Sequence, residues 1–127
     1  DVMPTLLSLA GAELPPMDGL NLLGEETRAW LHGEPAGGGD DSNHYIVTQT
    51  DKYVWFSKSG REQYFHLATD PQEAHDRIAD PACQARIADL RAHLIESLRG
   101  REEGYVQNER LVPGQKARNV LSTLPRE

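Results

Sequence analysis

The order of apolar and polar positions predicts a small antiparallel sheet in the middle of the chain. Short turn segments around Thr50 and Gly60 favour antiparallel neighbours in a meander. Tyr53 and Trp55 alternate with Val54 and Phe56, so both faces of the middle strand are expected to be apolar and one small helix cannot cover both. Three segments rich in Tyr, Val, Ile, Thr, Trp and Phe have strand composition: 44–50, 52–57 and 62–67.

The strongest helix signal follows the predicted sheet. Asp80 is suited to cap a helix that begins at Pro81, and Gly100 is suited to end it. A single apolar stripe runs along this segment and predicts the side that packs on the sheet: Ile87, Leu90, Leu94 and Leu98.

The flanking segments are less regular. A short helix over 1–10, stopped by Gly11, has apolar residues on too many sides for one narrow stripe and therefore needs burial on most sides. Residues 28–34 fit either a short strand or the end of a helix from Glu25, and we favour the strand. Residues 35–42 form a Gly-rich loop, whereas 101–127 carry scattered apolar side chains and predict an extended arm along another surface.

Composition narrows the class of protein. The 127 residues suit one compact soluble domain, and the formal charge of −7 argues against nucleic acid or an anionic membrane surface as a partner. The longest apolar runs are far shorter than the ~20 residues of a transmembrane helix. One cysteine leaves the redox compartment undetermined and excludes an internal disulfide.

The sequence gives little support for chemistry carried by this chain. The five histidines show no tight ligand spacing with one another, so no metal site is expected. Asp40 and Asp41 resemble a calcium-ligand pair without the further oxygen ligands that a calcium loop requires. Cys83 is read as a small residue in a first helical turn rather than a reactive thiol. Motifs of serine hydrolases, P-loop proteins and dinucleotide-binding proteins are absent.

Two ordered motif blocks resemble the sulfatase family. Residues 1–11, DVMPTLLSLAG, are similar to the family segment D-[ILV]-x-P-T-L-L-x-L-A-G and are followed by Leu14-Pro15, Asp18-Gly19 and Leu22-Leu23. Further along, 51–56, 62–67 and 69–73 are similar to the K-Y-x-W, E-x-L-[FY]-D-L and x-D-P-x-E sequences of the same family. The resemblance covers about the first 100 residues and is to bacterial arylsulfatases of the alkaline-phosphatase superfamily.

The resemblance implies an α+β fold and a division of the chain. In the family, a small antiparallel sheet of about four strands packs against a C-terminal helix, and residues 28–34 supply the fourth strand here. Residues 1–24 then form a helix and loop from the end of a large catalytic domain. Residues 25–100 form the C-terminal sulfatase subdomain, and 101–127 form the extended C-terminal arm.

The same resemblance implies that catalysis lies outside this chain. Sulfatases use a bound calcium ion and a formylglycine made from C/S-x-P/A-x-R, and that motif is missing: Cys83 has the wrong spacing to Arg86, and Ser57 is followed by Ser59 where Pro or Ala belongs. No catalytic, cofactor-binding or metal-binding residue is assigned, and this piece alone is expected to be inactive. His32 and Glu34 resemble an H-G-E-H stretch near the active-site rim, although Pro35 replaces its second His.

Three functions follow as hypotheses. The leading one is a structural sulfatase subdomain that shapes substrate access and has the catalytic domain as its partner. The second is the same subdomain in a phosphonate monoester hydrolase or phosphodiesterase. The third is a free-standing interaction module, with exposed apolar faces that support a homo-oligomer.

Overall fold

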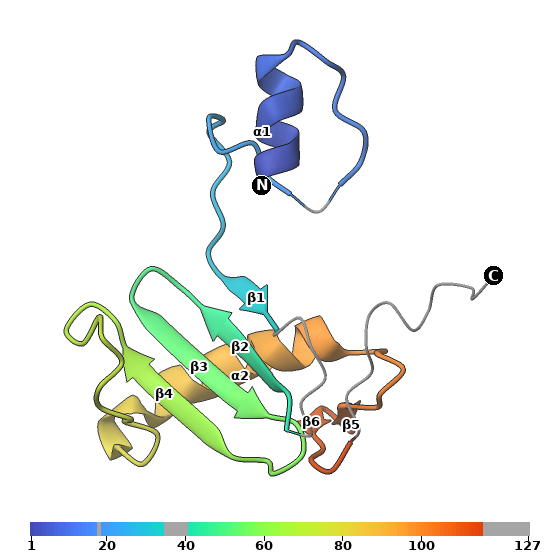
Figure 1. Cartoon of the computed structure of the whole chain (residues 1–127). Helices are drawn as coiled ribbons and strands as arrows, with labels where there is room; N and C mark the ends of the chain where they lie inside the picture. Colours follow the sequence, from blue (N-terminus) through green and yellow to red (C-terminus); the bar gives the residue numbers. More distant parts are fainter. Residues whose placement is uncertain (18, 35–40, 116–127) are drawn as a thin grey trace.

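The computed structural model describes residues 1–17, 19–34 and 41–115 of the chain (Figure 1). Its elements form an α+β fold, as the sequence predicts. In chain order they are α1 (Val2–Leu9), β1 (Leu31–Gly33), β2 (Asn43–Val47), β3 (Asp51–Phe56), β4 (Glu62–His66), a 3-10 turn (Pro81–Cys83), α2 (Gln84–Leu98), β5 (Val106–Gln107) and β6 (Arg110–Leu111). None of the helices in these ranges has the length and apolar character needed to cross a bilayer.

The main sheet is a four-stranded antiparallel meander with the order β1-β2-β3-β4. Tyr53 pairs with Ile46 on one side and with Tyr64 on the other. Residues 31–33 supply the fourth strand, so the alternative of a helix running from Glu25 through this segment is wrong. The meander and its strand count are confirmed.

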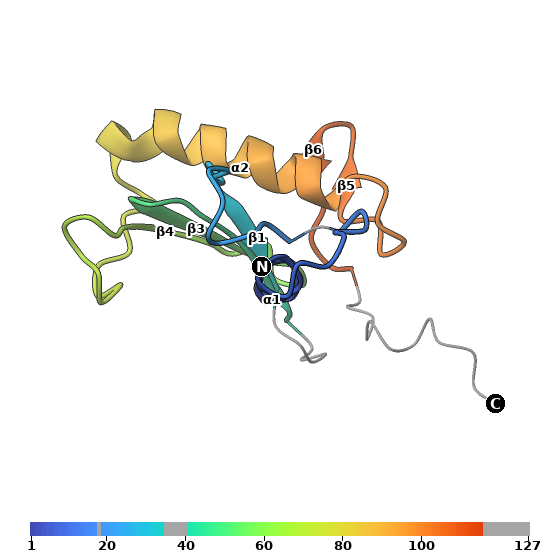
Figure 2. The ribbon, with the colours of Figure 1, turned by 90° about the horizontal axis from the view of Figure 1, so that it is seen from above.

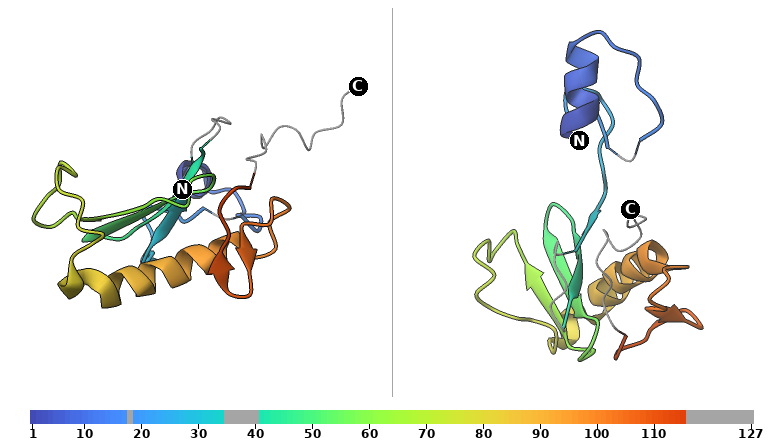
Figure 3. Two further views of the ribbon diagram at one scale, coloured as in Figure 1. Left: turned by 90° about the horizontal axis from the view of Figure 1, so that it is seen from below. Right: turned by 45° about the vertical axis from the view of Figure 1, so that its right-hand side comes forward.

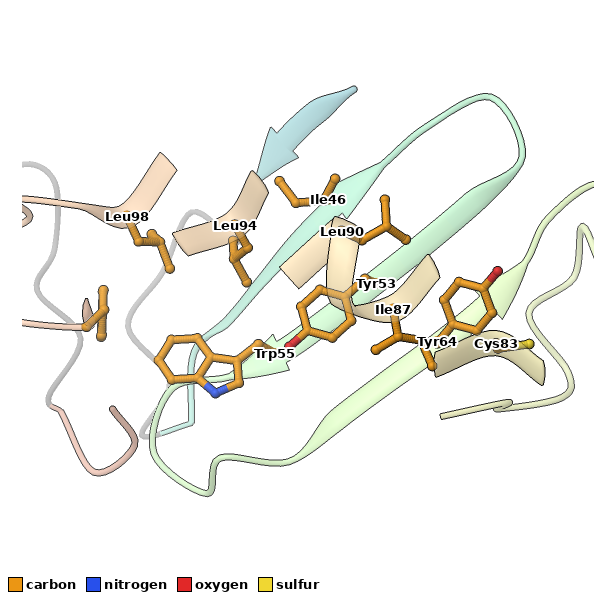
Figure 4. Close-up of a cluster of buried hydrophobic side chains, with 10 residues drawn as sticks. Ile46, Tyr53, Trp55, Tyr64, Cys83, Ile87, Leu90, Leu94 and Leu98 are labelled. Atoms are coloured by element: carbon orange, nitrogen blue, oxygen red, sulfur yellow. The ribbon is translucent and has the colours of Figure 1, made fainter. Parts of the chain in front are cut away.

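One face of the sheet is covered by α2, which lies along it (Figure 2). The side chain of Asp80 accepts a hydrogen bond from the Ala82 amide, and Pro81 occupies the first position, as the sequence predicts. Figure 4 shows the helix stripe meeting the aromatic side chains of the sheet. The core consists of Ile46, Tyr53, Trp55, Tyr64, Cys83, Ile87, Leu90, Leu94, Leu98 and Tyr105.

The opposite face of the sheet has no helix over it within the described ranges (Figure 3). Val54 and Phe65 are nevertheless only 7% exposed on this face. The guanidinium of Arg61 covers the ring of Phe56, with Cζ 3.8 Å from the ring centroid. The expectation of apolar character on both faces of β3 is confirmed.

The N-terminal helix α1 stands apart from the sheet and is joined to β1 by an extended segment (Figure 1). The carboxylate of Asp1 makes no helix-capping bond; it accepts hydrogen bonds from the Leu20 amide at 2.8 Å and from Arg28 at 2.6 Å. These bonds hold the returning loop against the start of the helix. Large apolar side chains on this unit are exposed: Val2, Met3, Leu6, Leu9, Leu14, Met17, Leu22 and Leu23.

A second sheet follows α2 and was not anticipated from the sequence. Strands β5 and β6 form a short hairpin, with Asn108 and Glu109 at positive φ in its turn. Tyr105, just before the hairpin, is 1% exposed and belongs to the core, while Val106 and Leu111 pack against it. The first part of the predicted arm therefore folds onto the core of the same chain. Residues 116–127 lie outside the described part.

Candidate functional site

Three side chains of types that can bind metal ions meet at one end of the helix-covered face. His32 and Glu34 are two residues apart and therefore project to the same side of the β1 segment. The pairing of β1 with β2 places His32 opposite Ile46, and one step further along this register Glu34 stands opposite His44. One donor atom from each of the three residues lies within 4.8 Å of the others. We call His32, Glu34 and His44 the histidine cluster.

His44 is the most enclosed member of the histidine cluster. The residue is 1% exposed, and its ring lies 4.8 Å from that of Tyr105 and 6.0 Å from that of Trp55, centroid to centroid. Its Nδ1 is 3.3 Å from Glu34 Oε2, but this approach lacks hydrogen-bond geometry. Among the described residues neither ring nitrogen has a hydrogen-bond partner, and the same is true of His32 Nε2. Buried polar atoms without partners are uncommon in folded proteins.

Charged residues from beyond α2 complete the surroundings. Arg101 Nη1 lies 3.2 Å from Glu34 Oε2, and its Nη2 lies 3.1 Å from Glu103 Oε1. The hydrogen bond from Arg101 lowers the pKa of Glu103, and both carboxylates raise the pKa of Arg101. Two carboxylates face one guanidinium, so this end of the core carries a negative charge when the histidines are neutral.

Burial keeps the histidines neutral. It lowers the pKa of His44 to about 4, against the raising effect of the Glu34 carboxylate. Burial also lowers the pKa of His32, again opposed by Glu34. At neutral pH both imidazoles are therefore neutral, and the neutral imidazole is the form that binds metal ions.

A second polar network, centred on Asp51, stabilises the contact between the sheet and α2. Tyr64 donates a hydrogen bond of 2.5 Å to Asp51, and Arg86 on α2 donates one of 3.0 Å to the other oxygen of the same carboxylate. Thr50 adds a third bond at 2.7 Å. The carboxylate of Asp51 is thus fully occupied by partners that tie the sheet to the helix.

Neither cofactor implied by the sulfatase resemblance fits the described residues. Cys83 is buried in the core, and burial raises the pKa of its thiol, which disfavours a reactive thiolate. Ser57 is fully buried at the end of β3. The Asp41 carboxylate accepts hydrogen bonds from the amides of Lys58 and Ser59 and so holds a hairpin turn; Asp40 lies outside the described residues. No step of sulfate chemistry can be assigned to these side chains.

The remaining histidines lie outside the cluster. His66 Nδ1 is 3.0 Å from the Thr69 hydroxyl, and the ring of His93 stacks on Trp30 at 5.0 Å between centroids. The side chain of His75 is 81% exposed. Sequence reasoning singled out His32 and Glu34 but gave His44 no role, because strand register rather than spacing along the chain brings it to them.

Comparisons with known proteins identify the family. No family model matches the chain. A curated arylsulfatase from Clostridium perfringens is 46% identical over 121 residues, which are 90% of this chain and 25% of that protein. These residues form a C-terminal sulfatase region.

Solved structures of sulfatases share the fold. A 2-O GAG sulfatase matches with a TM-score of 0.73 and 21% identity over 83% of this chain and 25% of its own. A structure described as a putative sulfatase from Bacteroides thetaiotaomicron matches with a TM-score of 0.73 and 20% identity over 90% of this chain and 29% of its own. This sulfatase region thus spans about a quarter of the length of the relatives it matches. The fold expected from the resemblance is confirmed.

Proposed function

We propose that this sulfatase region is a structural subdomain that packs against a catalytic domain of the same protein and shapes access to its active site. The observation that carries the proposal is the partial match: a 46% identical arylsulfatase is about four times as long as the matched segment. The reaction of the whole protein would be hydrolysis of sulfate esters. The formylglycine, the calcium ion and the groups that hold them would lie in the catalytic domain.

Exposed apolar surface supports the packing. On α1 and its returning loop, Leu6, Leu9, Leu22 and Leu23 are each more than half exposed. Apolar side chains gathered on one small unit to this extent are typical of a surface that is covered in the complete protein. Burial of one such leucine stabilises by about 1.5–3 kcal/mol, so covering these side chains would favour docking of the unit.

The rim role of His32 and Glu34 belongs to the same proposal. Both residues are half-buried and follow the segment that joins α1 to the sheet. His32 lies in β1, the edge strand that follows this segment, and Glu34 comes directly after β1; this position suits residues that border a shared cleft. Substitution at either position would then change KM for a bulky sulfate ester more than KM for a small one.

The test uses the full-length protein that contains this region. Leu6→Asp and Leu22→Asp place charges on the proposed docking surface, and Ala88→Asp does so on the exposed side of α2 as the matched control. We expect the first two changes to lower the melting temperature and the arylsulfatase activity together, and the control to leave both near the wild-type values. Wild-type behaviour of all three variants would contradict the docking.

Substrate assays distinguish hydrolysis of sulfate esters from hydrolysis of phosphonate monoesters or phosphodiesters. Nothing in the comparisons favours a phosphonate monoester hydrolase, a phosphodiesterase or a free-standing module. The full-length protein is expected to hydrolyse an aryl sulfate faster than an aryl phosphonate monoester or a phosphodiester, and the reverse order would overturn the assignment. The 127-residue chain alone is expected to show no turnover.

A further inference from the structure

We propose that the histidine cluster binds a transition-metal ion of the zinc class through His32, Glu34 and His44. This site is separate from the calcium and formylglycine chemistry of sulfatases, and it does not rest on the proposed function. It revises the sequence-based expectation that this chain holds no metal.

The donor set selects the kind of ion. Two imidazole nitrogens and one carboxylate oxygen are typical ligands of Zn²⁺ and its neighbours, whereas Ca²⁺ and Mg²⁺ take oxygen ligands. A tetrahedral zinc site with bonds of about 2.0–2.1 Å has its ligand atoms about 3.4 Å apart. Glu34 and His44 already approach to 3.3 Å, and all three donors lie within 4.8 Å. These separations are close to those that a zinc ion requires of its ligands.

His44 supplies the independent observation. It is 1% exposed, yet both of its ring nitrogens lack a hydrogen-bond partner within the described ranges. His32 Nε2 is buried and equally unpartnered. Burying such groups without partners destabilises the fold, and coordination of an ion would satisfy one nitrogen on each ring.

Local charge is compatible with a bound cation. Arg101 competes for Glu34, but it also holds Glu103, whose side chain is only 7% exposed. When Glu34 turns to an ion, Arg101 keeps Glu103 as its partner. The pair remains neutral, and the Glu34 carboxylate offsets half of the charge of a divalent ion.

The ion would tie the end of β1 to the start of β2. Glu34 directly follows β1, and His44 is the second residue of β2. Three protein ligands leave a fourth position for water.

The test compares metal binding by variants of the full-length protein. The protein is treated with a chelator and titrated with Zn²⁺, and with Co²⁺ as a spectroscopic probe of tetrahedral nitrogen and oxygen ligation. His32→Gln, Glu34→Gln and His44→Gln each remove a ligand, while His75→Gln alters an exposed histidine outside the cluster and is the matched control. Circular dichroism of the metal-free variants checks that each one folds.

We expect the wild-type protein and His75→Gln to bind one equivalent of Zn²⁺ more than any of the three ligand variants. Affinity at this site should fall by more than about 100-fold in the ligand variants, because losing even a group that only hydrogen-bonds to a ligand costs about 10- to 100-fold. Equal zinc content in wild-type protein and folded His32→Gln or Glu34→Gln would overturn the proposal. Because zinc content is read without substrate, this outcome is independent of sulfatase activity.

Discussion

Arg86 on α2 and Asp51 on β3 form an ion pair across the interface between helix and sheet, with 3.0 Å between Nη2 and Oδ2. The Asp51 side chain is 5% exposed and that of Arg86 is 39% exposed, so the pair lies at the margin of the core. Arg86 also contacts Asp89 on its own helix at 2.6 Å. The guanidinium therefore links one buried carboxylate to one exposed carboxylate.

Replacing the buried partner should be much more costly than replacing the exposed one. Asp51→Asn removes the charge and leaves Arg86 without its partner in the sheet, so we expect a loss of about 1–3 kcal/mol in the free energy of unfolding. Asp89→Asn should cost less than about 0.5 kcal/mol, because exposed pairs contribute little. Urea denaturation of both variants measures the two losses in free energy of unfolding. Equal losses would contradict the larger contribution expected of the buried Asp51.

The contribution of Asp51 should disappear in acid. Burial alone raises the pKa of its carboxyl, but the hydrogen bonds from Tyr64, Thr50 and Arg86 outweigh burial and hold this pKa below its usual value. As the pH falls, the unfolded chain therefore takes up this proton first, at about pH 4. The stability difference between wild type and Asp51→Asn should be constant above this pH and shrink below it. A difference that grows in acid would show that the pKa is raised.

Leu94 tests the packing of α2. Leu94 is fully buried on the side of α2 that faces the sheet. Leu94→Ala should lower the free energy of unfolding by about 2–5 kcal/mol. Glu96→Ala, on the exposed side of the same helix, should change it by less than about 0.5 kcal/mol. Thermal and urea unfolding check both values.

Gly33 tests the close approach of β1 and β2. A Cβ at this position would overlap the ring of Tyr45, its cross-strand partner. Gly33→Ala should therefore cost about 1–3 kcal/mol. In a Tyr45→Ala background the same change should cost clearly less, since the obstructing ring is gone. Strictly additive losses in this double-mutant cycle would mean that the contact is not the cause.

Cys83 should react slowly in the folded protein. Its side chain is buried, and burial raises the pKa of the thiol, so both access and thiolate formation are disfavoured. Alkylation followed by mass spectrometry of the peptide that carries Cys83 should show modification only after denaturation. Rapid labelling under native conditions would contradict this packing.

The central strands and α2 could be predicted because their sequence signals are local. Tyr53 and Trp55 alternate with other apolar residues, and Asp80 and Pro81 mark the start of a helix whose stripe fits one sheet face. The hairpin of β5 and β6 after α2 was not predicted from the sequence. Its strands have two residues each, and Tyr105 is buried by contact with Trp55 rather than by any periodic pattern around it.

The histidine cluster could be predicted only in part. His32 and Glu34 were singled out through a resemblance, and their spacing of two residues places them on one face. His44 joins them through the register of β1 on β2, and Arg101 arrives from the far end of α2. This register places His32 opposite Ile46, and His44 lies two residues away from Ile46 on the same face of β2.

The strand order of the main sheet has a consequence for folding kinetics. Because β1 to β4 pair in chain order, each pairing closes only a short loop, and such local connectivity favours fast folding. During synthesis the meander can therefore assemble as it leaves the ribosome. Its aromatic face stays bare until residues 84–98 arrive, so the interval before α2 docks is when this region is most prone to aggregation.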